Sequence, residues 1–255
     1  PSSPDRRHVT AGLVALDLPG GDAFVDALRR AWDAGDAVLP IDQRLAQEAR
    51  CALARRLGAG AIVDAAGSHP LASGIPVEPG DALVMATSGS TGEPKGVVLT
   101  HRAIEASARA TSARIGVADD DHWLACLPLS HIGGMSVVTR ALVTGSGLTV
   151  HAGFDAAAVD ASHATLVSLV ATALRRIDPT RWRTIVLGGS RLPADHPPNS
   201  IATYGMTETG SGVVYDGVPM GQTHVRLSPD GRVELGGPTL AEYYLDDPER
   251  TAAAF

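Results

Sequence analysis

One loop of the sequence gathers the residue types that bind phosphate. The segment Thr87-Ser88-Gly89-Ser90-Thr91-Gly92-Glu93-Pro94-Lys95-Gly96 combines glycines, which let backbone N–H groups approach an anion, with four hydroxyls and one ammonium group. Of the 21 lysines and arginines in the chain, 20 are arginine, so Lys95 is the single lysine. A compact ammonium charge placed only here indicates a specific need for it, and the loop predicts a triphosphate-binding site.

The loop does not match the Walker A phosphate-binding motif. The spacing G-x-x-x-x-G-K-[ST] is absent, and Pro94 disfavours a helix that opens at Lys95. Taken alone, the loop is also compatible with a flexible Gly/Ser linker.

A second polar segment, Tyr204-Gly205-Met206-Thr207-Glu208-Thr209, follows a predicted strand. A Tyr ring can cover an adenine face, a Thr hydroxyl can bond the α-phosphate, and a Glu carboxylate can hold Mg²⁺. One carboxylate suffices, because Mg²⁺ completes its coordination with water and phosphate oxygens. An ordinary polar turn is the alternative.

These segments need a scaffold, and the hydrophobic pattern predicts an α/β fold. The pattern favours helices at residues 21–34, 45–57, 101–115 and 134–142, with Thr100 capping the third, and a strand followed by a helix at residues 166–174. Short apolar runs predict strands at residues 37–39, 61–63, 82–86, 96–99, 123–127, 148–150, 184–187 and 201–203. Residues 67–80 are expected to form a loop, and residues 225–235 a hairpin. We therefore expect helix-covered, mostly parallel sheets with a small antiparallel region near the C-terminus, in sub-regions of about 1–80, 81–203 and 204–255.

Further motifs follow in a fixed order. They are Leu127-Pro128-Leu129-Ser130-His131-Ile132-Gly133-Gly134, Val186-Leu187-Gly188-Gly189-Ser190, residues 231–238, Tyr243-Tyr244 and Pro248-Glu249-Arg250-Thr251. Together with the two polar segments they resemble the adenylate-forming superfamily of acyl-CoA synthetases, adenylation domains and luciferases, over about residues 35–255. The resemblance implies the large N-terminal AMP-binding domain of that superfamily.

The resemblance also implies roles for individual residues. The β- and γ-phosphates would be bound by Thr87, Ser88, Gly89, Ser90, Thr91, Gly92 and Lys95, the α-phosphate by Thr207, and Mg²⁺ by Glu208. The adenine slot would be formed by Gly188, Gly189, Ser190 and Tyr204, with Gly205 and Met206 beside it. His131, Gly133 and Gly134 would lie at the wall of the acyl pocket. For His131, a satisfied core histidine is the alternative.

The chemistry that follows is activation of a carboxylic acid. A carboxylate attacks the α-phosphorus of ATP, while Mg²⁺, Lys95 and the loop hydroxyls neutralise the repulsion between the two anions. The resulting acyl-AMP then passes its acyl group to a thiol, most simply coenzyme A. Lys95, Thr207, Glu208 and His131 are the candidate catalytic residues.

Within the superfamily, the chain resembles the o-succinylbenzoate-CoA ligases of menaquinone biosynthesis. Arg140 lies nine residues after His131 on an otherwise apolar segment and could hold a second carboxylate. A solvated arginine at an exposed helix edge is the alternative. A carrier-loading adenylation domain and a nucleotide-binding module without activity also remain open, although the absence of Asp between residues 127 and 142 disfavours an amino acid substrate.

Composition narrows the partners. A formal charge of −7 with scattered basic residues disfavours nucleic acid, and no apolar run approaches the roughly 20 residues of a membrane helix, so a cytoplasmic protein is expected. Whether the chain forms a homodimer is left open. Superfamily members continue into a C-terminal domain that carries a second lysine; we expect this domain to be absent here, and ATP binding and turnover to be weak.

Overall fold

The computed structural model describes residues 11–88, 94–190 and 196–255. Within them, two seven-stranded sheets and one two-stranded sheet form. Sheet 1 has the strand order β16 (Tyr243–Tyr244), β6 (Pro94–Thr100), β5 (Asp81–Ser88), β2 (Ala37–Pro40), β1 (Leu13–Leu16), β3 (Ala61–Asp64) and β4 (Gly67–Pro70). Its centre, β3-β1-β2-β5, is parallel, and antiparallel strands flank it on both sides.

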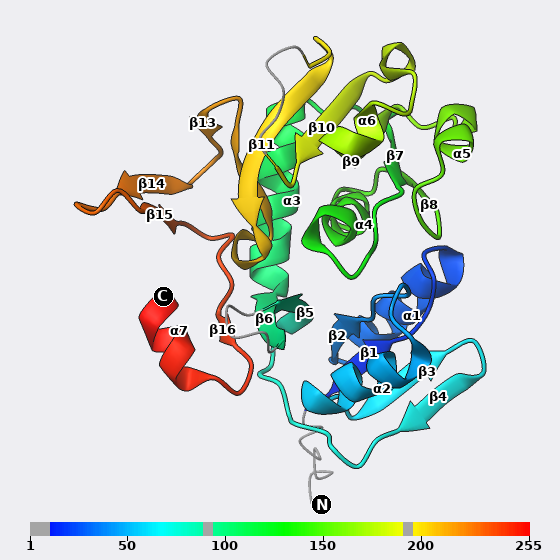
Figure 1. Cartoon of the computed structure of the whole chain (residues 1–255), viewed down its shortest axis with the longest axis vertical. Helices are drawn as coiled ribbons and strands as arrows, with labels where there is room; N and C mark the ends of the chain where they lie inside the picture. The colour runs from blue at the N-terminus through cyan, green and yellow to red at the C-terminus, as the bar shows by residue number, and fades with distance from the viewer. Residues whose placement is uncertain (1–10, 89–93, 191–195) are drawn as a thin grey trace, which may run out of the picture.

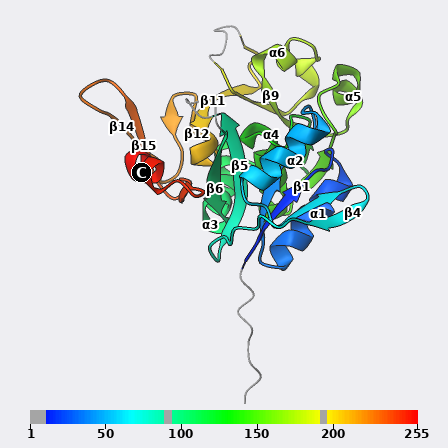
Figure 2. The same ribbon diagram turned by 60° about the horizontal axis from the view of Figure 1, so that its bottom comes forward.

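Sheet 2 is also mostly parallel. Its order is β13 (Val218–Pro219), β12 (Ser211–Tyr215), β11 (Ser200–Met206), β10 (Thr184–Gly188), β9 (Leu166–Val170), β7 (His122–Ala125) and β8 (Gly147–Val150). The strands from β11 to β8 run parallel, and β12 and β13 are antiparallel. A separate hairpin, β14 (His224–Leu227) with β15 (Val233–Gly236), projects from the body of the molecule (Figures 1 and 2).

Helices fill the space between the two sheets. Figure 1 shows α3 (His101–Ile115) and α4 (Ile132–Thr144) between sheet 1 and sheet 2. With α1 (Asp22–Asp33) they share one core with both sheets, in which Phe24, Leu83, Val138 and Val186 are buried. Because α4 has neighbours on all sides, every residue from Gly134 to Ala141 is buried. The middle of α4 is therefore shielded from bulk water.

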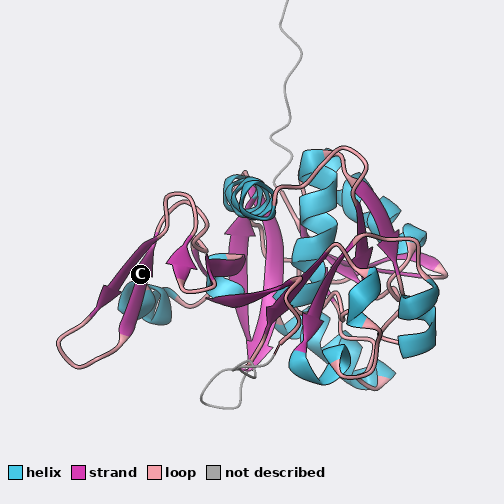
Figure 3. Ribbon diagram, turned by 90° about the horizontal axis from the view of Figure 1, so that it is seen from above, coloured by secondary structure: helices cyan, strands magenta, loops and turns pink. Residues whose placement is uncertain are grey.

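The outer faces of the sheets are covered by shorter helices, visible from above in Figure 3. α2 (Gln47–Arg56) packs against the outer face of sheet 1, where Leu13, Leu39 and Val84 are buried. α5 (Ala156–Ala161) and α6 (Ala171–Leu174) cover sheet 2. The short helices η1 (Pro179–Arg181), η2 (Thr207–Thr209) and α7 (Pro248–Ala254) complete the described chain. No helix in the described ranges is long and apolar enough to cross a membrane.

The expected α/β class is confirmed, including the mostly parallel sheets and the antiparallel hairpin near the C-terminus. The predicted Thr100 cap is present, since its hydroxyl accepts a hydrogen bond from the N–H of Ala103 at 3.2 Å. Five strands were missed: β1, at the centre of sheet 1, β4, inside the expected loop of residues 67–80, and the antiparallel strands β12, β13 and β16. The boundaries expected near residues 80 and 203 do not separate the sheets, because sheet 1 joins β2 to β5 and β11 spans residue 203.

Candidate active site

Lys95 and Glu208, which the sequence places in separate motifs, meet in the folded chain. Lys95 lies on β6 and Glu208 in η2, and the Lys95 ammonium donates to Glu208 Oε1 at 2.7 Å. Tyr244 on β16 joins them: its hydroxyl accepts from Lys95 Nζ at 3.0 Å and donates to Glu208 Oε1 at 2.9 Å. The same ammonium lies 4.1 Å from the centroid of the Tyr244 ring.

Both charges of this pair are maintained by their neighbours. Burial alone would lower the pKa of Lys95, but hydrogen bonds to Glu208 and Tyr244 raise it overall. Burial alone would raise the pKa of Glu208, but the hydrogen bond from Lys95 lowers it overall. The pair is therefore an ammonium and a carboxylate at neutral pH.

The residues present fit a magnesium ion held mainly by phosphate. Glu208 offers an ionised carboxylate whose charge is balanced by Lys95. Over the described ranges, no cluster of three or more His, Cys, Asp or Glu residues forms a protein cage for a metal. A metal at Glu208 would therefore take one carboxylate from this chain and its other ligands from phosphate and water.

The predicted phosphate loop is described only at its base. Residues 89–93 lie outside the described residues, so the roles expected of Gly89, Ser90, Thr91 and Gly92 stay predictions, as does that of the Ser88 side chain. Thr87 and Lys95 are directly opposite each other on β5 and β6. Among the described residues, the buried Thr87 hydroxyl has no hydrogen-bond partner. The base of the loop thus pairs a hydroxyl-bearing residue with Lys95 across the two strands.

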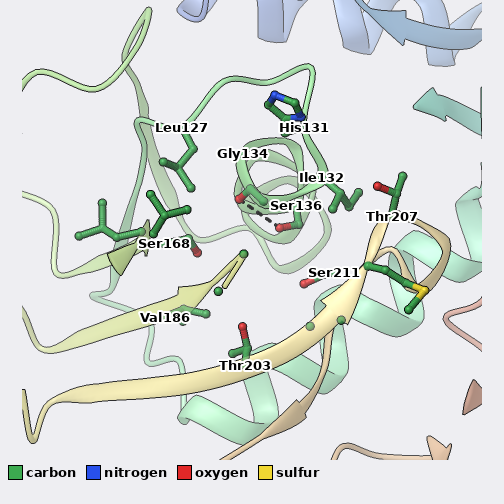
Figure 4. Close-up of a pocket in the computed structure, with 18 of the residues that line it drawn as sticks. Leu127, His131, Ile132, Gly134, Ser136, Ser168, Val186, Thr203, Thr207 and Ser211 are labelled. Carbon is green, nitrogen blue, oxygen red and sulfur yellow. Dashed lines mark hydrogen bonds between the residues drawn. The ribbon is translucent and has the colours of Figure 1, made fainter. Parts of the chain in front are cut away.

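A cavity of about 470 Å³ opens beside Thr207, between α4 and sheet 2 (Figure 4). The predicted residues His131, Gly133, Gly134, Arg140, Gly188, Gly189, Gly205, Met206 and Thr207 all line it, together with Arg44, Ser136, Ser168, Ser211 and apolar side chains. Gly134 permits the close approach of α4 to the preceding turn, because a Cβ there would lie 2.4 Å from the carbonyl oxygen of Pro128.

Arg140 is buried in the wall of this cavity, so the alternative of a solvated arginine is wrong. It is only 3% exposed, and its guanidinium donates to Ser168 Oγ at 3.2 Å, Ser136 Oγ at 3.0 Å and Ser211 Oγ at 2.8 Å. Figure 4 shows these three serines around the cavity, on α4, β9 and β12. The guanidinium carbon also lies 5.2 Å from the Trp123 ring centroid.

The partners of Arg140 are all neutral. No carboxylate in the described ranges pairs with it, and its Nε has no hydrogen-bond acceptor there. Burial lowers the pKa of Arg140, yet a guanidinium stays charged at any pH at which this fold exists. A buried charge without a counter-ion is costly, so the cavity is suited to an anionic ligand.

His131 precedes the first turn of α4 and contacts a residue from the N-terminal part of the chain. Its Nε2 lies 2.6 Å from Nη2 of Arg44, which also binds Asp42 through Nε at 2.8 Å and Nη2 at 2.6 Å. Burial and the positive charge of Arg44 lower the pKa of His131. Because a guanidinium only donates, Nε2 is the acceptor and His131 is neutral, with its proton on Nδ1.

A second cavity, of about 580 Å³, adjoins the first. Gly189, Ser190, Tyr204 and Gly205, all predicted to bind the nucleotide, line it, and Gly189, Thr203 and Gly205 also line the first cavity. Gly205 lets β11 and β12 approach closely, since a Cβ there would meet the Ser211 carbonyl oxygen at 2.1 Å. The two cavities thus share part of their lining, and Thr207, next to Glu208 in the chain, lines the first of them.

Several residues of this site were missed in the sequence. Tyr243-Tyr244 stood in a recognised motif, but nothing marked Tyr244 as a partner of Lys95 and Glu208. Arg44 is one of 20 arginines, and Ser136, Ser168 and Ser211 lie on separate elements without a common pattern. Only the folded chain brings them together.

This fold, with a lysine–glutamate pair beside two adjoining cavities, defines a protein of the adenylate-forming class. The chain belongs to the AMP-binding enzyme family, whose model matches residues 64–251.

Curated relatives agree with that family. A protein named probable 2-succinylbenzoate–CoA ligase from Mycobacterium tuberculosis is 37% identical over 187 residues, covering 64% of this chain and 48% of the relative. A 2-succinylbenzoate–CoA ligase from Geobacillus is 30% identical over 215 residues, covering 68% and 43%. The chain thus spans about half, or less, of the length of these relatives.

Two structures show the same fold. The o-succinylbenzoate coenzyme A synthetase of Bacillus subtilis in complex with AMP has a TM-score of 0.79 at 22% identity, with 95% of this chain and 79% of that chain covered. The inhibitor-bound N-terminal domain of FACL13 from Mycobacterium tuberculosis has a TM-score of 0.81 at 21% identity, with 96% and 81% covered.

Proposed function

We propose that this chain forms the site at which a carboxylic acid is activated by ATP and then joined to coenzyme A in the cytoplasm. The observation that carries the proposal is the buried Arg140 guanidinium, which has only neutral partners among the described residues and faces a cavity next to the predicted nucleotide slot. A ligand carboxylate would supply the missing negative charge.

In the first step, an oxygen of the acid's carboxylate forms a bond to the α-phosphorus of ATP, and the bond between the α-phosphorus and its bridging oxygen to the β-phosphate breaks. Pyrophosphate leaves and acyl-AMP remains. Lys95 and the hydroxyls at the base of the loop would neutralise the phosphates, and Thr207 would bind the α-phosphate. Mg²⁺, held by Glu208, would reduce the repulsion between the attacking carboxylate and the triphosphate.

In the second step, the thiol of coenzyme A loses its proton to water and its sulfur attacks the acyl carbon, the bond between that carbon and the AMP oxygen breaks, and AMP leaves. His131 at the mouth of the cavity is neutral and adds no second charge beside the mixed anhydride. Its proposed role is to form part of the wall of the cavity that holds the acyl group.

The acid is proposed to carry a second carboxylate, with o-succinylbenzoate, of the menaquinone pathway, as the favoured example. Arg140 can bind that carboxylate bidentately once Ser136 or Ser211 gives up its bond to Nη2, because a guanidinium then presents paired N–H groups to two oxygens. The relatives named 2-succinylbenzoate–CoA ligases support this choice. An amino acid is disfavoured, because no Asp or Glu among the described lining residues could hold its ammonium group.

A matched pair of ligands tests the proposal. A stable o-succinylbenzoyl-AMP analogue and the same analogue with its remaining carboxylate replaced by hydrogen are titrated calorimetrically into the chain. A buried charge pair contributes about 3 kcal/mol, so the carboxylate should increase affinity about 100-fold. Equal affinities would exclude the dicarboxylic acid, and failure of both analogues and of ATP to bind would exclude the adenylation site itself.

A further inference from the structure

Tyr244 reaches the Lys95–Glu208 pair from a distant segment that is fixed on both sides. The N–H of Ala241 donates to the carbonyl of Glu208 at 2.7 Å, and the N–H of Leu245 donates to the carbonyl of Gly96 at 2.8 Å. Tyr244 itself is paired with Val97 on β6 and is 6% exposed. Its backbone is therefore tied to the two elements that carry the ion pair.

The hydroxyl of Tyr244 is fully used by the pair. A phenol has one proton to donate, which goes to Glu208, and an oxygen that accepts from Lys95. The ring lies under the ammonium, where its negative face attracts a cation. Tyr244 thus contacts each charged group independently of the bond between them.

Under the proposed function, a nucleotide and a metal ion would compete with the bond between Lys95 and Glu208. The ammonium would turn to the phosphates and the carboxylate to the cation, so each would give up its charged partner in the described structure. The contacts with Tyr244 need not break, because its ring can stay under the ammonium and its hydroxyl can keep donating a hydrogen bond to the carboxylate.

We propose that Tyr244 is a positioning residue. It holds Lys95 and Glu208 in place while Lys95 turns from Glu208 to the triphosphate and Glu208 turns from Lys95 to the metal ion. This rests on the proposed function, since it assumes that the pair binds ATP and Mg²⁺. Tyr244 touches neither reacting atom and acts through the two groups it orients.

The test compares two neighbouring tyrosines by calorimetric titration of ATP, with Mg²⁺ and with EDTA. Tyr244→Phe keeps the ring and removes the hydroxyl. Tyr243→Phe is the matched control, because the Tyr243 hydroxyl donates to Asp81 at 2.6 Å and has no contact with the pair. A hydrogen bond to a charged group predicts about tenfold weaker binding of ATP with Mg²⁺ for Tyr244→Phe and unchanged binding for Tyr243→Phe.

The metal dependence separates positioning from a structural defect. Without Mg²⁺, Tyr244→Phe should weaken ATP binding by no more than about twofold. An equal loss with and without Mg²⁺, or no loss in either condition, would overturn the role of Tyr244. Lys95→Ala tests the underlying function separately: if it binds ATP with Mg²⁺ as tightly as the wild type, the nucleotide site itself is wrongly placed.

Discussion

Replacing Arg140 by methionine should remove recognition of a dicarboxylic acid without unfolding the protein. Methionine keeps an unbranched chain of similar length and deletes the charge. The three hydrogen bonds to serine hydroxyls stabilise the fold by about 1.5–3 kcal/mol each. Against them stands the desolvation penalty of a buried cation, which amounts to several kcal/mol.

These two terms are of similar size and opposite sign. The serine hydroxyls left behind line the cavity, so water can reach them and their cost is small. The free energy of unfolding should therefore change by less than about 2 kcal/mol, and the melting temperature by less than about 8 °C. The affinity for a ligand with a second carboxylate should fall about 100-fold, because the carboxylate loses its charged partner.

The assay combines thermal unfolding with titration of the paired acyl-AMP analogues described above. Arg176→Met is the control, since Arg176 also lies over an aromatic ring, 5.0 Å from the Phe154 centroid, but is exposed. The reasoning is refuted if Arg140→Met weakens both analogues equally. It is also refuted if the free energy of unfolding falls by more than about 4 kcal/mol, because Arg140 would then be needed mainly for the stability of the fold.

Three further predictions concern the site and its frame. Arg44→Ala should raise the pKa of His131, because it removes a positive neighbour; an NMR titration that shows no rise would contradict the contact. Gly205→Ala should destabilise the fold by about 3 kcal/mol in urea unfolding, since its Cβ would lie 2.1 Å from a carbonyl oxygen that cannot move away. Burial alone would raise the pKa of Asp121, but the hydrogen bond from Arg183 lowers it overall. The stability that the ionised Asp121 contributes is present above about pH 4 and is lost as pH falls. Asp121→Asn should therefore reduce the loss of unfolding free energy between about pH 5 and 3, and an unchanged pH dependence would contradict this role of Asp121.

The strong periodic helices could be predicted from the sequence, but five of the strands, β1 and β4 among them, were not. The predicted helix of residues 101–115 coincides with α3, because its cap and its apolar spacing are both local signals. β1 has four residues, too few for a period, and it is defined by parallel pairing with β2 and β3. β4 is exposed throughout and has no apolar signal, so only its backbone pairing with β3 makes it a strand.

The site shows a similar division. Lys95 and Glu208 could be selected by residue type, because a lone lysine and a carboxylate in polar motifs suggest phosphate and metal. Their mutual contact could not be predicted, since it depends on where η2 lies relative to β6. The hydrogen-bond partners of Arg140 could not be predicted either. They are three serines on different elements, and only the fold brings their hydroxyls to one guanidinium.

The two parts of the proposed site differ in charge balance. At the nucleotide end, Lys95 and Glu208 neutralise each other; at the acid end, Arg140 has no counter-ion among the described residues. Under the proposed function, phosphate alone would leave Glu208 unpaired and a metal ion alone would leave Lys95 unpaired. The nucleotide and its metal therefore restore the balance only together, whereas a carboxylate satisfies Arg140 by itself. Binding of the nucleotide should therefore depend on the metal ion, whereas selection of the acid depends on the charge of Arg140, which is already in place.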